Sequence, residues 1–332
     1  MKILYLSCHE ILEHQELTLL TELGHDVFSV GGAFQNPFSP GLKRPPILGM
    51  QYHEHLSEVA IQCSKENLHP ELIEWADVII VMHRPDWIIS NWQKIRHKRV
   101  IWRTIGQSIS QQEASLELPR RQGMQIVRYS PREDRIPGYL GKDSLIRFYV
   151  CPSEYDGWTG EDTSVITVAQ SMKTRGKFCG FETFEKATQP FPRFLYGPGN
   201  EDSGIPGGQL SYEDLKERLR RYRVFFYTGT YPASYTLGFI EAFMMGIPIV
   251  AAGPGLWDAG FFPNHDLYEV HLLLGSEGEA GYWADTIPEL QTYIRRLLLD
   301  EEEAQRIHQN ARAMAIKLFS KDEAKKGWKE FL

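Results

Sequence analysis

Short apolar runs alternate with longer amphipathic stretches along the whole chain. Runs such as Lys2–Ser7, Ala76–Met82 and Arg99–Arg103 have the length and apolar density of buried parallel strands. The stretches between them, such as Leu12–Leu23 and Trp87–His97, carry apolar residues at helical spacing. Alternation of this kind predicts an α/β protein with parallel sheets.

Two alternating series are predicted, separated by a stretch rich in proline, glycine and aspartate between Ser130 and Gly160. In the first series the further elements are a strand at His25–Val30, a helix at Gln111–Arg121 and a strand at Gln125–Tyr129. In the second series the strands are Ser164–Ala169, Phe191–Tyr196, Val224–Tyr227 and Ile249–Ala252, and the helices are Cys179–Ala187, Tyr212–Arg221, Pro288–Leu299 and Glu301–Leu318. The two series predict two Rossmann-like halves of about 150 residues each. Ligands are expected at the carboxyl ends of their strands. Their boundary is predicted near Val150–Gly160.

The stretch Tyr231–Gly253 combines a loop, a helix with one acidic residue and a short apolar strand. The amides of Tyr235, Thr236 and Leu237 are predicted to lie at the helix start. Such amides lack internal partners and carry the positive end of the helix dipole, so they can hold a phosphate. Glu241, deeper in the helix, is placed to accept hydrogen bonds from sugar hydroxyls. The alternative is an ordinary buried βα unit whose glutamate is solvated.

This stretch resembles the donor-site motif of retaining glycosyltransferases of family 4, which belong to the GT-B superfamily. The family pattern has two glutamates separated by seven residues, then a small-residue turn, a proline and an apolar strand. Glu241-Ala242 matches the second glutamate, and Gly246–Val250 matches the turn and strand. The first glutamate falls on Ala233. In the family the second glutamate binds the nucleotide ribose and the first contacts the donor sugar, so the resemblance supports nucleotide binding better than sugar handling.

A second matching segment is Val165–Gly176, VITVAQSMKTRG, which resembles a family strand that ends in Gly-Arg and is followed by Lys-Gly. The arginine position is Gln170 here, and the lysine position is Arg175. The resemblance implies that a cation at this place neutralises the donor diphosphate, a task that suits the arginine fork. Lys173 and Lys177 are alternatives to Arg175, and each of the three cations is also consistent with a solvated surface.

Further matches extend across the second half of the chain. Gly197, in a Gly-Pro-Gly turn, resembles the family turn at which the backbone approaches the nucleotide. The closing stretch Leu318–Leu332 resembles the family's terminal helix, which crosses back onto the first domain. The resemblance therefore implies a GT-B fold, with two Rossmann-like domains facing each other across a cleft. The implied parts are an acceptor domain at 1–155, a nucleotide-sugar donor domain at 156–315 and a returning helix at 316–332.

The first half resembles the family mainly in its strand order. The loop Ser7–Glu10 lacks the family's glycine pair, and Thr104–Gly106 lacks its histidine. His83 and His9 each follow a predicted strand, so both are expected at the ligand edge, where they would contact the donor sugar or the acceptor. Arg103 is a similar candidate for phosphate or acceptor contact. A structural role for each histidine is the alternative.

Composition restricts the class of protein. With 332 residues, 42% hydrophobic and 24% charged, the chain is typical of a globular protein of one or two domains. Four scattered cysteines show no zinc spacing and are predicted to be reduced thiols. The apolar run at the start of the chain is too short for a signal peptide. No apolar run of about 18–20 residues predicts a membrane span. A cytoplasmic protein is expected.

Charge is distributed unevenly. Residues 1–150 hold 17 basic and 17 acidic residues, whereas the whole chain carries −7. Residues 84–147 hold 13 basic and 6 acidic residues. A solvated face is one reading of this region, and a surface for a phosphorylated or polyanionic acceptor is the other.

Other chemistries lack their sequence signals. No glycine-rich dinucleotide loop follows the first strand, and neither a phosphate-binding P-loop nor a hydrolase elbow is present. The resemblance implies a retaining glycosyltransferase with a UDP- or GDP-sugar donor and no bound cofactor or metal. Its acceptor is a glycan, a lipid-linked or phosphorylated molecule, or a nucleic acid held by residues 84–147. The alternatives are an enzyme that glycosylates a modified base in nucleic acid and a catalytically silent nucleotide-sugar-binding relative.

Overall fold

The computed structural model describes residues 1–31, 46–257 and 267–332. The chain divides into two compact units, which are treated separately below. Unit 1 contains Met1–Phe148 together with Asp322–Leu332, and unit 2 contains Tyr149–Lys321. Residues 149–155, which the sequence assigned to the first domain, thus belong to unit 2.

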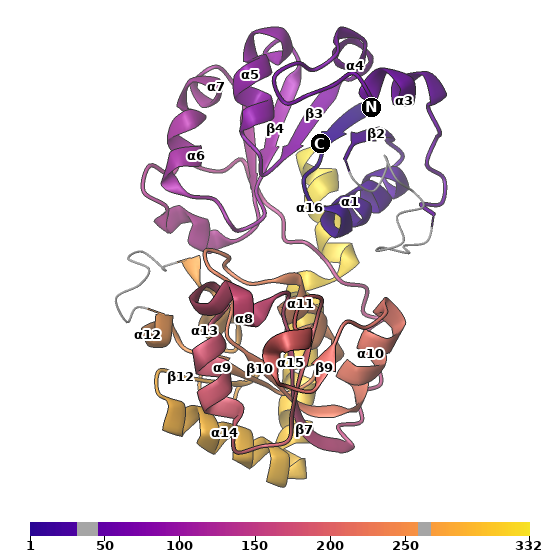
Figure 1. Cartoon of the computed structure of the whole chain (residues 1–332). Helices are drawn as coiled ribbons and strands as arrows, with labels where there is room; N and C mark the ends of the chain where they lie inside the picture. Colours follow the sequence, from indigo (N-terminus) through magenta and orange to yellow (C-terminus); the bar gives the residue numbers. More distant parts are fainter. Residues whose placement is uncertain (32–45, 258–266) are drawn as a thin grey trace. The chain divides into compact units, whose positions relative to one another are not determined.

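Unit 1 is built on a parallel sheet (Figure 1). Its six strands pair in the order β2-β1-β3-β4-β5-β6. The strands are β1 (Lys2–Leu6), β2 (Asp26–Val30), β3 (Val78–Met82), β4 (Arg99–Arg103), β5 (Gln125–Arg128) and β6 (Ser144–Leu145). The central strand β3 is buried at every position, as its unbroken apolar run requires when helices cover both faces of a parallel sheet.

The helices of unit 1 follow its strands and begin and end at recognisable signals. α1 begins after His9, whose ring nitrogen caps it, and Gly24 follows its end with φ +81°, a conformation that glycine adopts without strain. The predicted helix Gln111–Arg121 is interrupted at Leu116. Among the described residues of unit 1 the helices are α1 (Glu10–Glu22), α3 (Glu54–Ala60), α4 (Pro70–Trp75), α5 (Asp86–Ile95), α6 (Ser110–Ser115), α7 (Glu117–Arg121), a 3₁₀ turn at Pro131–Arg135, and α16 (Lys321–Phe331). The helices α3 and α4 were missed by the sequence pattern.

A buried carboxylate, Glu16 on α1, connects distant parts of unit 1. It accepts hydrogen bonds from the Arg103 guanidinium (2.8 Å), the Tyr5 hydroxyl and the Trp328 indole N–H (3.3 Å). Arg103 and Trp328 are fully buried. Three donors around one carboxylate compensate for its removal from water.

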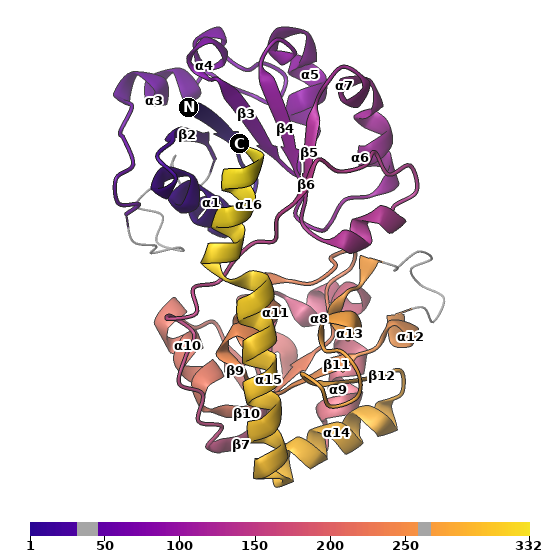
Figure 2. The ribbon, with the colours of Figure 1, turned by 180° about the vertical axis from the view of Figure 1, so that it is seen from behind.

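The helix α16 packs beside α1 in unit 1 (Figure 2). Lys325 forms an ion pair with Glu22 of α1 at 3.5 Å. At the far end of α16, Arg99 of β4 donates to the carbonyl oxygens of Phe331 (2.7 Å) and Leu332 (3.0 Å), so a cation lies at the negative end of the helix. Side chains of unit 1 therefore hold the middle and the carboxyl end of α16.

Unit 2 has a second parallel sheet of six strands, in the order β12-β11-β10-β7-β8-β9. The strands are β7 (Asp162–Val168), β8 (Arg193–Tyr196), β9 (Gly207–Gly208), β10 (Tyr222–Tyr227), β11 (Ile249–Ala252) and β12 (Tyr282–Ala284). Both sheets are parallel, as connections through helical crossovers require, but their strand orders differ: two strands, β8 and β9, lie on one side of the first strand β7 in unit 2, whereas β2 alone lies on that side of β1 among the described strands of unit 1.

The helices of unit 2 cover this sheet (Figures 1 and 2). They are α8 (Met172–Arg175), α9 (Phe181–Thr188), α10 (Tyr212–Arg221), α11 (Leu237–Met245), α12 (Pro254–Trp257), α13 (Val270–Leu273), α14 (Ile287–Leu299) and α15 (Glu301–Phe319), with 3₁₀ turns at Gly176–Cys179 and Glu201–Ser203. The predicted helix Cys179–Ala187 begins later, at Phe181, because Gly180 adopts a left-handed φ of +63°. Among the helices of the described ranges, none combines the length and the apolar character that crossing a membrane requires.

Candidate functional site

The start of α11 is fixed by a tyrosine at the end of β10. The buried Tyr227 hydroxyl accepts the Thr236 N–H (3.1 Å) and donates to the Thr236 side-chain oxygen (3.3 Å). Internal helix bonding begins at the amides of Phe239 and Ile240, which donate to the Thr236 carbonyl. The amides of Leu237 and Gly238 therefore form the first turn.

This geometry changes the predicted set of phosphate donors. Thr236 was predicted to offer its amide to a phosphate, but that amide donates to Tyr227. Tyr235 lies outside the helix, and its buried ring packs against Phe239 and Phe319. Of the three predicted amides, only that of Leu237 belongs to the first turn.

Glu241 lies one turn further along α11 and is largely buried. Its Oε1 accepts a hydrogen bond of 2.8 Å from the hydroxyl of Tyr155, which is buried too. Burial, followed by the negative charge of Glu241, raises the pKa of Tyr155, so this hydroxyl keeps its proton and remains a donor. Sequence reasoning missed Tyr155, since 86 residues separate it from Glu241.

Ala233, at the position of the family's first glutamate, is buried with 1% of its surface exposed. The neighbouring Ser234 is also buried, and its carbonyl accepts the amide of Glu269. A glutamate at position 233 would have to place its charge inside this packed loop, where burial is costly. The small residue therefore fits the local packing.

Two loops at the carboxyl edge of the unit 2 sheet are joined by Asn200. Its side-chain amide donates to the carbonyl oxygens of Ala169 (2.6 Å) and Gly197 (2.9 Å), and its oxygen accepts the Met172 N–H (2.8 Å). The predicted nucleotide contact Gly197 has φ +123°, and a Cβ there would lie 2.3 Å from the Ala169 oxygen. Only glycine allows this approach. Asn200 directly follows the Gly-Pro-Gly turn, but its role had no signal in the sequence.

Ser171, between these loops, has a left-handed φ of +45°. In the described residues, the other non-glycine residue with positive φ is His83, directly after β3 of unit 1. Both follow the carboxyl end of a strand. Such conformations are costly for residues other than glycine and are concentrated at functional sites.

Arg175 ends the short helix α8 and is exposed. The segment after it is bonded to the β10–α11 loop, because the Phe178 carbonyl accepts the Tyr231 amide (2.8 Å) and the Cys179 carbonyl accepts the Thr228 hydroxyl (2.6 Å). Arg175 and the start of α11 thus lie at the same edge of the sheet.

The alternative cations near Arg175 are less suited to an anion. The Lys173 ammonium donates to the Asp202 carbonyl (2.9 Å), and Lys177 lies 6.0 Å from the centre of the Phe178 ring. Gln170 is exposed and neutral. Arg175 therefore remains the first candidate.

His83 lies at the carboxyl edge of the unit 1 sheet. Its backbone N–H donates to the Arg103 carbonyl (2.8 Å), and its carbonyl accepts the Trp102 indole N–H (3.1 Å). The buried Nδ1 atom has no hydrogen-bond partner within the described structure. Burial, and secondarily the charge of Arg84, lowers the pKa of His83 to about 4, so the ring is neutral near pH 7.

The low pKa of His83 predicts a pH-dependent stability. Between pH 6.5 and about 4 the unfolded histidine binds a proton that the folded one does not, so the free energy of unfolding should fall as pH falls through this window. The slope should reach up to about 1.4 kcal/mol per pH unit. The variant His83→Asn should flatten this part of the profile, since asparagine tolerates a positive φ.

Urea unfolding of both proteins at several pH values measures the slope. The other histidines are common to both proteins, so the difference between the two profiles isolates His83. Parallel profiles would contradict the buried neutral state.

The two other unit 1 candidates have structural partners. The Nδ1 atom of His9 accepts the Leu12 N–H at 3.4 Å and caps α1. Burial lowers the pKa of His9. The expectation that Arg103 contacts phosphate or acceptor is corrected, because its side chain has no exposed surface and its charge is paired with Glu16.

Part of the positive charge of residues 84–147 is not available at a free surface. Arg128 is fully buried and ion-paired with Glu113 and Glu133. Arg120 and Arg121, at the surface, are paired with Asp143 and Glu117. Because these charges are compensated locally, the count overstated the potential available to a polyanion.

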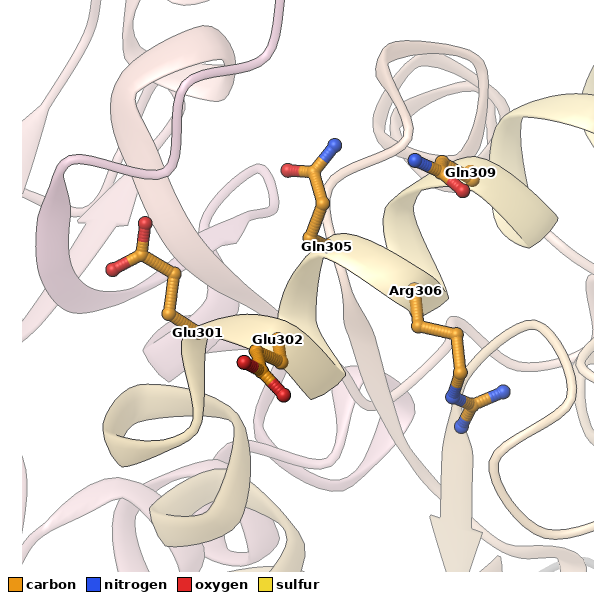
Figure 3. A pocket seen from close by; sticks show the side chains of 5 residues that line it. All are labelled: Glu301, Glu302, Gln305, Arg306 and Gln309. Carbon is orange, nitrogen blue, oxygen red and sulfur yellow. The ribbon is translucent and has the colours of Figure 1, made fainter.

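The hollow in Figure 3 is a separate feature of α15. Its lining residues are Glu301, Glu302, Gln305, Arg306 and Gln309, all from one helix. Arg306 forms an ion pair with Glu303 (2.7 Å). None of the predicted site residues lines this hollow.

His53 and His55, two histidines of one short segment, bond different carboxylates, Asp26 (2.6 Å) and Glu71 (2.6 Å). Within the described ranges, no cluster of three or more histidine, cysteine or acidic side chains is arranged to hold a metal ion. Each histidine is therefore engaged with a carboxylate of its own.

Several solved glycosyltransferases share this architecture. A structure of Anabaena HepE in complex with UDP and glucose is similar over 99% of this chain and 98% of its own, with a TM-score of 0.69 and 14% identity. The chain has the GT-B fold. The predicted fold class is confirmed.

Two further structures with the GT-B fold show the range of proteins that share it. A glycosyltransferase from Rickettsia africae matches 99% of this chain and 97% of its own, with a TM-score of 0.69 and 13% identity. An alpha-glucosyltransferase in complex with UDP-glucose and DNA containing an abasic site matches 99% and 98%, with a TM-score of 0.59 and 13% identity. No protein-family model matches the sequence, and no curated protein matches it by sequence.

Proposed function

We propose that the protein is a retaining glycosyltransferase that transfers a sugar from a nucleotide diphosphate to an acceptor hydroxyl. The observation that carries the proposal is the arrangement of Glu241 and the first turn of α11 at the carboxyl edge of the unit 2 sheet, within a GT-B fold. This edge is where ligands bind in open α/β sheets. The HepE structure contains UDP and glucose, which favours a UDP-sugar over a GDP-sugar as donor.

Each part of this edge has a proposed role. The amides of Leu237 and Gly238 hold the diphosphate with Arg175, and Glu241 accepts the ribose hydroxyls. The tight turn at Gly197 lets the backbone approach the nucleotide. As the sugar leaves, charge develops on the diphosphate, and these fixed donors stabilise it.

Retention follows from attack on the face that the phosphate leaves. In that mechanism the leaving phosphate accepts the proton of the acceptor hydroxyl, so no strong protein base is needed. His83, neutral and at the carboxyl edge of unit 1, is proposed to hydrogen-bond the acceptor. The proposed acceptors are a glycan, a lipid-linked or phosphorylated molecule, or a nucleic acid held by the cations of residues 84–147 that remain exposed.

Thermal unfolding with uridine, guanosine, adenosine and thymidine diphosphates and their sugar conjugates tests the proposal. UDP at about 100 times its dissociation constant should add about 2.7 kcal/mol to the stability of the native protein. Release of UDP from the preferred conjugate, with the product configuration read by NMR, tests transfer and retention. Stabilisation without turnover would favour the catalytically silent relative, and the absence of any nucleotide effect would contradict the proposal.

A further inference from the structure

We propose that Tyr155 and Arg312 are positioning residues that orient Glu241 toward the nucleotide ribose. The inference rests on the proposed function, because it assigns a role to neighbours of the proposed ribose contact. It concerns a chain of hydrogen bonds that runs from α15 through the segment Pro152–Asp156 to α11, all within unit 2.

The first link is the bond from Tyr155 to Glu241. A glutamate side chain has three rotatable bonds, and ordering it during ligand binding costs conformational entropy. The 2.8 Å bond from the buried Tyr155 hydroxyl holds Oε1 before any ligand arrives. Two carboxylate oxygens offer about four acceptor sites, and the bond to tyrosine uses one of them.

The second link is Arg312 on α15, which holds the backbone that carries Tyr155. Its guanidinium donates to the carbonyl oxygens of Tyr155 and Pro152 (3.0 Å) and forms an ion pair with Asp156 (3.2 Å). The same guanidinium donates to the Met244 carbonyl (2.6 Å) at the end of α11. One side chain therefore fixes Tyr155 and the helix of Glu241 relative to each other.

The arrangement of α15 beside α11 makes this link possible (Figure 2). One turn before Arg312, the His308 Nδ1 bonds the Gly246 carbonyl (3.0 Å). Arg312 and His308 thus hydrogen-bond carbonyl oxygens at the end of α11, where these groups have no partner within the helix. A rigid α11 keeps Glu241 at a constant distance from the first turn, where the diphosphate is proposed to bind.

The variant Tyr155→Phe separates positioning from folding when it is measured with two ligands, UDP and 2′,3′-dideoxy-UDP. Wild-type protein should bind UDP much more tightly, because only UDP has the ribose hydroxyls. The variant should lose about tenfold in affinity for UDP, equivalent to one hydrogen bond, and less than twofold for the dideoxy ligand. Tyr222→Phe is the matched control, since Tyr222 is an equally buried tyrosine of unit 2 that bonds Tyr196 instead.

Calorimetric titration measures these affinities, and each outcome decides whether Tyr155 positions Glu241. Equal losses for both ligands in Tyr155→Phe would assign a purely structural role and overturn the inference. An unchanged affinity for UDP would overturn it as well. Wild-type protein that binds UDP and its dideoxy analogue equally would instead reject the ribose role of Glu241, and wild-type protein that binds neither would reject the UDP-sugar donor on which the inference rests.

The variant Arg312→Lys tests the second link. It keeps a positive charge near the end of α11 but loses the fork that bonds several carbonyl groups at once. We expect the same ribose-dependent loss as in Tyr155→Phe, with a lower melting temperature. Full discrimination between UDP and its dideoxy analogue in this variant would exclude Arg312 from positioning.

Discussion

Replacement of Glu241 by alanine should weaken nucleotide binding by about two orders of magnitude. Two hydrogen bonds from ribose hydroxyls to a carboxylate contribute about 1.5 kcal/mol each at the low end, and tenfold in affinity corresponds to about 1.4 kcal/mol. Calorimetric titration with UDP measures the loss directly. Unchanged affinity would remove Glu241 from the site.

The same substitution has a smaller effect on folding. It leaves the Tyr155 hydroxyl buried without its acceptor, which costs about 1–3 kcal/mol. The double variant Glu241→Ala/Tyr155→Phe should recover most of this stability without recovering affinity. Glu217→Ala is a matched control, because Glu217 is an exposed glutamate of the same unit paired with Arg220, and both properties should stay near wild type.

Replacement of Arg103 by methionine should lower the free energy of unfolding by about 3–5 kcal/mol. The substitution leaves the Glu16 carboxylate buried without its main positive partner. The double variant Glu16→Gln/Arg103→Met should recover a large part of the loss, since it removes the charge as well. Urea unfolding of the two variants measures both effects.

A surface arginine of the same unit provides the comparison for Arg103. Arg135 is exposed and lies 3.6 Å from Asp134, so Arg135→Met should change stability by less than about 1 kcal/mol. If Arg103 instead contacted phosphate or acceptor, Arg103→Met would reduce transfer while leaving the unfolding curve unchanged. That result would restore the prediction made from the sequence.

The hydrophobic pattern of the sequence was sufficient to predict the main strands and helices around the two sheets. The bounds of β4, α10 and β11 match their predictions, because β4 and β11 are short, almost fully buried runs and α10 begins directly after the capping residue Ser211. The strands β6 and β9 have two residues each and lie at sheet edges, so they leave no periodic signal. Their pairing depends on the neighbouring strand.

Charged residues near strand ends were harder to interpret. The sequence places Arg103 at the end of a predicted strand and Arg128 one residue before the end of another, but it does not show that Glu16 and Glu113 fold against them. Arg103 and Glu16 are 87 positions apart. A charge is therefore assigned to surface or core only once its partner is known.

The candidate donor site could be predicted in part from the sequence. Glu241 and Gly197 stand in local motifs, and the fold brings their segments to one edge of the sheet. Tyr155 and Arg312 have no such motif, because each acts through atoms of distant segments. Side chains that orient a motif residue become visible only in three dimensions.

The return of α16 to unit 1 has a consequence for the order in which the units fold during translation. The ribosome releases the chain from its amino terminus, and Trp328 follows the whole of unit 2. Until then Glu16 lacks one of its three donors, and the surface of α1 that α16 covers stays in contact with solvent. Unit 2 is contiguous in sequence, so the unit that is synthesised second is the first that can close its core completely.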